Sequence, residues 1–254
     1  MILSDTINNI LKTYHSLSLE NAERVKLMNR IDTKYIITID DVFSLLNALR
    51  QNYHVLEISS QRTGTYTSIY YDTSDRKMFY SHVTGRLPRY KVRERTYSQN
   101  GQKFFEVKQK DNKRRTFKQR ISILENSSEV NDWLPQQAPF NSEDLSPVLV
   151  NSFERITLIN NEHTERVTVD FNIQFSAPTG AVTPIYDRIA IVELKQNKTA
   201  ESFVRKYLRS NGVHPKSVSK FCMGLLLLFG NETGYKRYKK YFSQFIKSQN
   251  EQNA

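Results

Sequence analysis

The chain has 254 residues, 38% of them hydrophobic and 25% charged, which is typical of an ordinary globular protein long enough to bury a substantial core. Its 37 Lys and Arg outnumber 26 Asp and Glu, and the net charge of +11 favours an anionic partner: nucleic acid, a phospholipid surface or a polyphosphorylated molecule. The single cysteine, Cys222, excludes an intramolecular disulfide framework and fits a reducing compartment.

Neither the start of the chain nor its apolar runs indicate export or membrane insertion. The stretch MILSDTINNILKTYHS lacks the basic start and apolar core of a signal peptide. The longest apolar run, residues 225–229, is far too short to cross a membrane. We therefore expect a cytoplasmic protein without a transmembrane segment.

The first half of the chain predicts mostly strands. Apolar residues at helical spacing predict a short helix at 5–16. A strand is expected at 29–38, followed by a helix that Asp40 caps and that runs to about residue 51. From 64 to 123 the sequence reads almost entirely as strand, with His82 placed at a hairpin end.

The second half predicts further strands and then helices. Residues 125–150 are polar and proline-containing, and they predict one or two short helices. Strands resume at 153–159, 165–175 and 188–196, and helices follow at 199–210 and 219–229. These elements predict one α+β domain on an antiparallel sheet at 29–230, between an N-terminal helical leader at 1–28 and a basic C-terminal helix and tail at 231–254.

The segment RYKVRERTYSQNGQKFFEVKQK at residues 89–110 predicts a hairpin that turns at Asn100-Gly101. Side chains alternate across a strand, so every second residue lies on the same face. One face of this hairpin then carries Arg89, Lys91, Arg93, Arg95, Glu106, Lys108 and Lys110. The neighbouring Tyr70 and Tyr71 are expected to be packing residues.

The same alternation of charged and apolar residues recurs on most of the other predicted strands. A half-solvated sheet is the ordinary explanation, but solvated faces usually mix charges of both signs, whereas Arg and Lys dominate here. Like charges opposite one another cost free energy unless an anion lies between them. We therefore expect the sheet to curl until its cationic faces converge on a polyanion, with the apolar faces packed on helices outside.

Nine short segments between Asn29 and Leu228 carry this pattern. In chain order they are RIDTKY, SIYYDT, RYKVRER, FFEVKQK, RTFKQR, SFERITL, ERVTVDF, AIVELKQ and SVSKF. Together they resemble the VTC (vacuolar transporter chaperone) polyphosphate polymerase domain of the triphosphate tunnel metalloenzyme, or CYTH-like, superfamily. The resemblance implies an eight-stranded antiparallel β-barrel tunnel with a basic interior and helices packed outside. It also implies an enzyme that transfers the γ-phosphate of ATP to a growing polyphosphate chain, with Mn²⁺ or Mg²⁺ as cofactor.

The resemblance also implies roles for individual residues. Those matched to triphosphate binding are Lys34, Arg93, Arg95, Lys108, Lys118, Arg155, Arg166 and Lys220, to which strand parity adds Lys195. Those expected to act in catalysis are Arg93, Arg95, Lys118 and Lys220. Glu193 matches the carboxylate that holds the metal, and Glu106 and Asp170 face the same bore by strand parity as further metal ligands.

The first strand departs from part of the superfamily in an informative way. The triphosphatase and adenylate-cyclase branches carry Glu-x-Glu-x-Lys there, whereas this chain has Arg30-Ile31-Asp32-Thr33-Lys34. The loss of carboxylates favours the VTC branch. The absence of a Gly-x-x-x-x-Gly-Lys-Ser/Thr loop disfavours a P-loop kinase.

Two alternatives to a polymerase stay open from the sequence. The tunnel could instead hydrolyse tripolyphosphate or nucleoside triphosphates, or it could be a non-catalytic receptor for polyphosphate or inositol polyphosphates. Nucleic acid is not expected, because the predicted cationic faces carry few aromatic residues for base stacking. If the polymer crosses a membrane, a separate membrane-protein partner must supply the pore.

Overall fold

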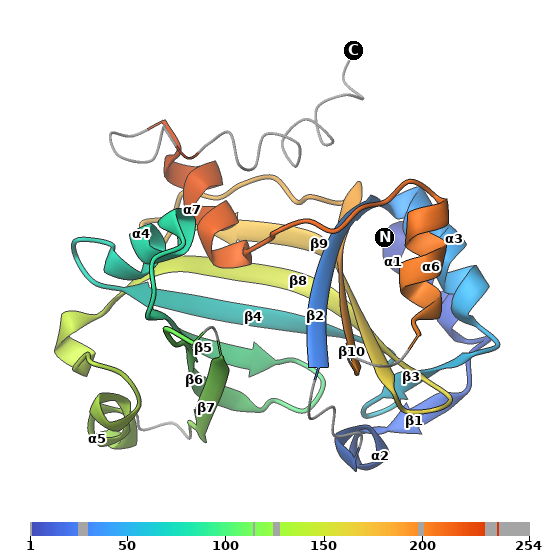
Figure 1. The fold of residues 1–254 in the computed structure, drawn as a ribbon, viewed down its shortest axis with the longest axis horizontal. Coiled ribbons are helices and arrows are strands. Elements are labelled where there is room, and N and C mark those ends of the chain that lie inside the picture. Colours follow the sequence, from blue (N-terminus) through green and yellow to red (C-terminus); the bar gives the residue numbers. More distant parts are fainter. Residues whose placement is uncertain are drawn as a thin grey trace.

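The computed structural model describes residues 2–24, 30–113, 115–123, 128–197, 201–231 and 238 (Figure 1). The strands are β1 (Ser16–Ser18), β2 (Arg30–Thr38), β3 (Tyr53–Glu57), β4 (Thr63–Asp72), β5 (Arg89–Tyr97), β6 (Lys103–Lys110), β7 (Thr116–Ser122), β8 (Ser146–Asn160), β9 (Glu165–Ser176) and β10 (Ile189–Asn197). The helices are α1 (Ile2–Leu11), α2 (Leu19–Arg24), α3 (Ile39–Leu49), α4 (Lys77–Thr84), α5 (Ser128–Gln137), the short 3₁₀ turn η1 (Ser142–Asp144), α6 (Phe203–Ser210) and α7 (Lys220–Phe229).

One antiparallel sheet organises the molecule. Eight strands follow one another in the order β2-β10-β9-β8-β4-β5-β6-β7, and the short β3 pairs with both β8 and β1. The predicted α+β architecture with an antiparallel tunnel sheet and helices outside is therefore confirmed. One detail differs from a closed barrel: no backbone pairing joins β2 to β7 in the part of the chain that the structure describes. The tunnel is a curled sheet with two edges.

One face of the sheet packs on α1, α3 and α6, which Figure 1 shows together beside β2 and β10. The alternation that the sequence predicted supplies this apolar face, because Val167, Val169 and Val192 are all buried against the helices. Helix α3 contributes a stripe at helical spacing, which consists of Val42, Leu45, Leu46 and Leu49. This core holds the three helices against the apolar, outer face of the curled sheet.

A second apolar cluster joins α4, α5 and α7 to the other half of the sheet. Helix α7 lies against β8 and β9, where an added Cβ on Gly224 would come within 2.5 Å of Phe175 and 2.7 Å of Leu149. The helix thus approaches the sheet closely enough to require glycine. Helix α7 begins at Lys220, with Ser219 as its N-cap, and its N-terminus faces the charged part of the sheet.

Several local expectations need correction. The N-cap of α3 is Thr38, whose hydroxyl accepts from Asp41 N, and not Asp40. Residues 77–84, expected within a strand-rich stretch, form α4, because the buried carboxylate of Asp72 accepts from the backbone N–H groups of Met78 and Phe79. His82 therefore lies on this helix and not at a hairpin end.

Other elements agree with the sequence or lie outside the described residues. The hairpin of β5 and β6 is confirmed, and Gly101 has a positive φ of 68° in its loop. The strands β1 and β3 were not expected. The predicted basic helix at 231–254 lies outside the described residues apart from 231 and 238. No helix in the described ranges is long and apolar enough to span a membrane.

Candidate functional site

The cationic face that the alternation predicted is continuous across the sheet, and we call it the inner face. Its register can be followed from strand to strand: Arg93 of β5 pairs with Glu106 of β6, and Lys34 of β2 pairs with Glu193 of β10. Between them, Arg155 of β8 pairs with Asp170 of β9. Because each pair is in direct cross-strand register, their side chains lie on the same side of the sheet.

The curl brings the two ends of this face together. Strand β6 lies far from β2 along the sheet, yet the charges of Lys34, Glu193 and Asp32 act on the ammonium of Lys108. A polar cavity of about 360 Å³ has walls from both ends of the sheet. Its lining comprises Asp32, Lys34, His82, Arg89, Lys91, Lys108, Lys110, Thr116, Lys216, Ser217, Val218, Ser219 and Cys222. The inner face is therefore concave, as the sequence predicted.

Glu106 holds the first pair of cations. Its side chain is 2% exposed, and Oε2 accepts from Nε and Nη2 of Arg93 at 2.7 and 2.6 Å. Nζ of Lys118, from β7, lies 2.5 Å from Oε1. Burial alone would raise the pKa of Glu106, but Arg93 and Lys118 lower it to about 2. Glu106 is thus an ionised counter-ion that ties β5, β6 and β7 together.

Asp170 holds a second pair in the same manner. Both carboxylate oxygens accept from Arg155, and Oδ2 also accepts from Nζ of Lys220 at the start of α7. The side chain is 1% exposed, and its pKa is about 2 because the two cations outweigh the effect of burial. Lys220 Nζ also lies 4.4 Å from the ring centroid of Phe153.

Glu193 holds a third pair, Lys34 and Lys195. Lys34 Nζ donates to Oε1 at 3.2 Å, and Lys195 donates to the same oxygen. Lys195 also lies 4.0 Å from Asp32. Burial would raise the pKa of Glu193, but the charges of Lys195 and Lys34 hold it well below its usual range.

Arg95 differs from these paired cations. It is buried, and in the described part of the chain its guanidinium donates to one group, the hydroxyl of Ser68, at 3.0 Å. The Arg95 Cζ atom lies within 6 Å of the rings of Tyr66 and Phe153. Burial and the nearby charge of Arg93 lower the pKa of Arg95. The site therefore contains a buried positive charge that no carboxylate contacts directly.

Two residues need a revised description. Tyr70, expected to be a packing residue, accepts a hydrogen bond from Arg93 Nη1 at 3.3 Å, and although burial raises its pKa, the charges of Arg93, Arg95 and Lys91 lower it to about 8. Asn172 would share a side with Asp170 by strand parity, since it follows two residues later, but it has a φ of 49° at a bulge and bonds Glu154 and Ser4 instead.

Arg166 and Lys91 complete the comparison with the sequence. Arg166 shares the inner face with Lys195, but its Nη2 donates to the carbonyl of Ala22 at 2.6 Å, toward α2. Lys91 lies on the charged face of the hairpin, but the resemblance assigns it no role in the site. Its ammonium donates to Ser219 Oγ at 3.0 Å and lines the 360 Å³ cavity. Strand parity alone would have selected it.

The predicted metal ligands do not form one cluster. The described residues contain no group of three or more His, Cys, Asp or Glu side chains that could hold a metal ion by themselves. Cations contact all three carboxylates, but Glu106 and Asp170 are almost inaccessible, whereas the Glu193 side chain is 16% exposed. One carboxylate with phosphate oxygens and water completing the shell is a usual environment for Mg²⁺, so Glu193 fits the implied metal.

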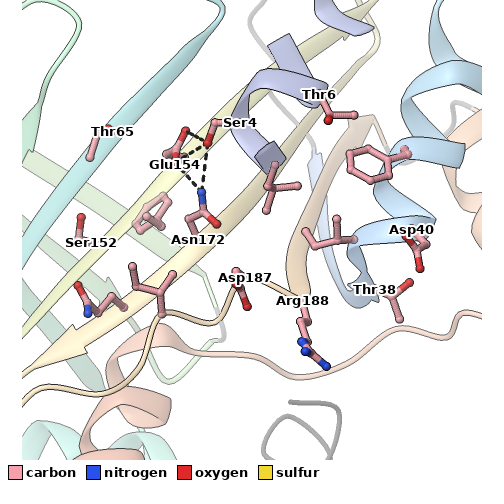
Figure 2. A pocket seen from close by; sticks show the side chains of 16 residues that line it. Ser4, Thr6, Thr38, Asp40, Thr65, Ser152, Glu154, Asn172, Asp187 and Arg188 are labelled. Atoms are coloured by element: carbon pink, nitrogen blue, oxygen red, sulfur yellow. Dashed lines mark hydrogen bonds between the residues drawn. The ribbon is translucent and has the colours of Figure 1, made fainter. Parts of the chain in front are cut away.

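Another cavity, of about 1030 Å³, is separate from this face (Figure 2). It lies between α1, the start of α3 and the strands β8 and β9, and Figure 2 shows Glu154 accepting hydrogen bonds from Ser4 and Asn172 at its edge. Within the described residues, none of the predicted phosphate-binding cations lines it. The inner face therefore remains the candidate site.

A concave basic sheet face with buried carboxylates and a helix N-terminus suits an anionic ligand. The VTC domain family matches residues 29–229, and the chain belongs to this family. A search of curated proteins finds no match.

Solved structures share the fold. A candidate adenylate cyclase from Bacillus halodurans has 14% identity and a TM-score of 0.50, and the match covers 76% of this chain and 96% of that one. HpAC1 from Hippeastrum, a candidate adenylyl cyclase described with a dominant triphosphatase activity, has 14% identity and a TM-score of 0.47, over 76% and 94% of the two chains. PH1819 from Pyrococcus horikoshii has 17% identity and a TM-score of 0.46, over 78% and 95%.

Proposed function

We propose that this protein is a metal-dependent polyphosphate polymerase that transfers the γ-phosphate of ATP to the end of a polyphosphate chain. Membership of the VTC domain family supports this proposal. The observation that carries it is the convergence of cations from both ends of the curled sheet on one cavity, with Lys34 on β2 and Lys108 on β6. Such a site suits a linear chain of phosphates, because each phosphate can meet cations from more than one wall.

The residues of the inner face would act by binding and charge neutralisation. In phosphoryl transfer the protein aligns the reactants, neutralises the oxygens of the transferring group and excludes water. Arg93, Arg95, Lys118 and Lys220 are the cations that we assign to the transferring phosphate. Since the terminal phosphate of the acceptor chain is already anionic, no general base is required.

The remaining cations would hold the rest of the phosphate chain. We assign this role to Lys34, Lys108, Arg155, Arg166 and Lys195. Glu193 would hold Mn²⁺ or Mg²⁺, which when bound supplies Lewis-acid charge to the phosphate oxygens. ATP and polyphosphate are the proposed substrates, the cytoplasm is the proposed location, and a membrane-protein partner would be needed for export of the polymer.

The outcome of the reaction tests the proposal directly. Purified protein is incubated with ATP labelled at the γ-phosphate and Mn²⁺, and the products are separated on a polyphosphate gel. The polymerase predicts label in long chains. Label released entirely as inorganic phosphate would instead identify a triphosphatase, and binding without turnover would identify a receptor. The variant Arg93→Ala should lower the yield of labelled chains.

A further inference from the structure

Asp170 was expected to be a metal ligand, but its surroundings indicate another role. Arg155 Nε and Nη2 donate to the two carboxylate oxygens, at 2.5 and 2.7 Å, and Lys220 Nζ donates to Oδ2. The carboxylate is 1% exposed. A metal ion would have to displace a bidentate guanidinium from a nearly inaccessible group, which leaves no open coordination position on Asp170.

The two cations come from different elements. Arg155 lies on β8, and Lys220 is the first residue of α7, and the side chains of both bond Asp170. The start of α7, capped by Ser219, adds the positive end of a helix dipole at the same place. Two cations and a helix N-terminus therefore converge on a buried carboxylate at the inner face.

We infer that Asp170 is a positioning residue, which holds Arg155 and Lys220 side by side so that together they bind one phosphate of the substrate chain. Asp170 itself contacts neither substrate nor metal. Glu106 has the same arrangement with Arg93 and Lys118, which shows that the sheet uses a buried carboxylate twice to gather cations from two elements. Glu193, the more exposed carboxylate, is left for the metal.

The carboxylate also keeps Lys220 charged. Burial lowers the pKa of Lys220, Asp170 raises it, and Arg155 lowers it further. The groups that face Lys220 are Asp170 from β9, Arg155 from β8, and Tyr70 from β4, with the Phe153 ring beside them. Without the Asp170 charge, Lys220 would lose protons at a lower pH and would bind phosphate only in more acidic solution.

The test compares Asp170→Asn with the wild type in two binding measurements. In EDTA, the affinity for inorganic tripolyphosphate at pH 8 should fall about tenfold, and the loss should become smaller as the pH is lowered, because Lys220 is then protonated more fully. Without phosphates, Mn²⁺ binding followed by electron paramagnetic resonance should stay within twofold of the wild type. Glu193→Gln, which removes the proposed metal ligand, should instead weaken Mn²⁺ binding strongly.

The controls separate this role from a general loss of stability. Glu165→Gln removes another buried carboxylate, which Tyr53 bonds beside α6, and should leave tripolyphosphate binding unchanged. If Asp170→Asn does not fold, the double variant with Lys220→Met removes one charge of each sign. It should bind tripolyphosphate more weakly than Lys220→Met alone, because Asp170 also holds Arg155 in place.

Two results would overturn the assignment. Loss of Mn²⁺ binding in Asp170→Asn to the same extent as in Glu193→Gln would make Asp170 a metal ligand. Unchanged tripolyphosphate affinity at pH 8 would show that it positions nothing. Because this role for Asp170 rests on the proposed function, the wild type is measured first. If the wild type does not bind tripolyphosphate, the polyphosphate tunnel itself is refuted. If it binds and Asp170→Asn binds equally well, only the positioning role is refuted.

Discussion

Lys34 of β2 and Glu193 of β10 are direct cross-strand partners, and the Lys34 ammonium donates to Glu193 Oε1 at 3.2 Å. Lys195 donates to the same oxygen. These two cations keep Glu193 ionised well below the usual pKa of a glutamate, despite its burial. Strand β10, next to the edge strand β2, thus presents a carboxylate that stays ionised, and a divalent metal requires such an anionic ligand.

Glu193→Gln should therefore abolish metal-dependent turnover while leaving the fold intact. Changes in groups that merely support a metal ligand cost roughly 10–100-fold in affinity or activity, so loss of the ligand itself should cost at least as much. The measurement is the initial rate of γ-phosphate transfer over a Mn²⁺ titration. Glu154→Gln, which lies at the other cavity beside Ser4, is the matched control and should keep the wild-type rate. Equal rates in the two variants would contradict the role of Glu193.

Phosphate binding should weaken as the pH rises through about 8. The pKa of Lys108 is lowered to about 8. The main cause is desolvation of its ammonium in the curled sheet, and repulsion from Lys91 and Lys34 adds to it. Lys118 has a pKa of about 8 as well, because its own desolvation outweighs the opposing charge of Glu106. Since the protonated form binds phosphate, affinity is complete below this pH and falls above it.

The check is the dissociation constant of tripolyphosphate in EDTA between pH 7 and 9.5. Substitution of Lys108 by Met should lower the affinity at pH 7 and flatten the pH dependence. Lys103→Met, which removes an exposed lysine that pairs with Glu94 on the same strand pair, is the control. A wild-type affinity that stays constant up to pH 9.5 would show that neither lysine titrates in this range.

Strand periodicity made much of the inner face predictable. A period of two places Arg93, Arg95, Glu106 and Lys108 on one side whatever the details of packing, and the registers of β5 and β6 agree with it. The same rule failed at Asn172, because a bulge with positive φ turns that side chain toward Ser4. A bulge depends on the partner strand, so one strand's sequence does not reveal it.

Tertiary contacts explain the other differences. Helix α4 forms because Asp72, at the end of β4, bonds its first turn, and Gly85 with φ of 76° ends it. A glycine such as Gly85 is a signal for the end of a helix that the sequence itself shows. The bonds from Asp72 to the first turn of α4 depend on the folded structure and are not visible in the sequence. Likewise, parity placed Asp170 and Glu193 on the same face, but only the structure shows that Asp170 is enclosed by Arg155 and Lys220.

Removal of the charge from Arg93 and from Arg95 should have different effects on the stability of the fold. Arg93→Met leaves the buried carboxylate of Glu106 with Lys118 alone, which should destabilise the fold by about 3 kcal/mol. Arg95→Met removes a buried charge that no carboxylate of the described residues contacts, in surroundings formed partly by Tyr66. It should leave stability unchanged or raise it by about 1 kcal/mol.

Both variants should nevertheless bind tripolyphosphate at least tenfold more weakly, because each removes an arginine from the inner face. Urea denaturation gives the stabilities and calorimetry in EDTA gives the affinities. A stable Arg95→Met that binds tripolyphosphate as well as the wild type would show that Arg95 is a structural residue. Destabilisation of Arg95→Met to the same degree as Arg93→Met would refute the difference in their pairing.

Gly224→Ala should destabilise the protein through the contact between α7 and the sheet. Alanine favours a helix by about 1 kcal/mol over glycine, but the new methyl group would lie 2.5 Å from Phe175 and 2.7 Å from Leu149, both buried. Overpacking of a filled core costs about 1–3 kcal/mol, so the balance should be a net loss of about 1 kcal/mol.

Gly64→Ala is the matched control, since the atoms nearest to its new methyl group belong to the flexible side chain of Gln99. Thermal unfolding should show a melting temperature about 2–4 °C lower for Gly224→Ala, and little change for Gly64→Ala. Equal melting temperatures for Gly224→Ala and the wild type would mean that α7 does not approach β8 and β9 as closely as these contacts require.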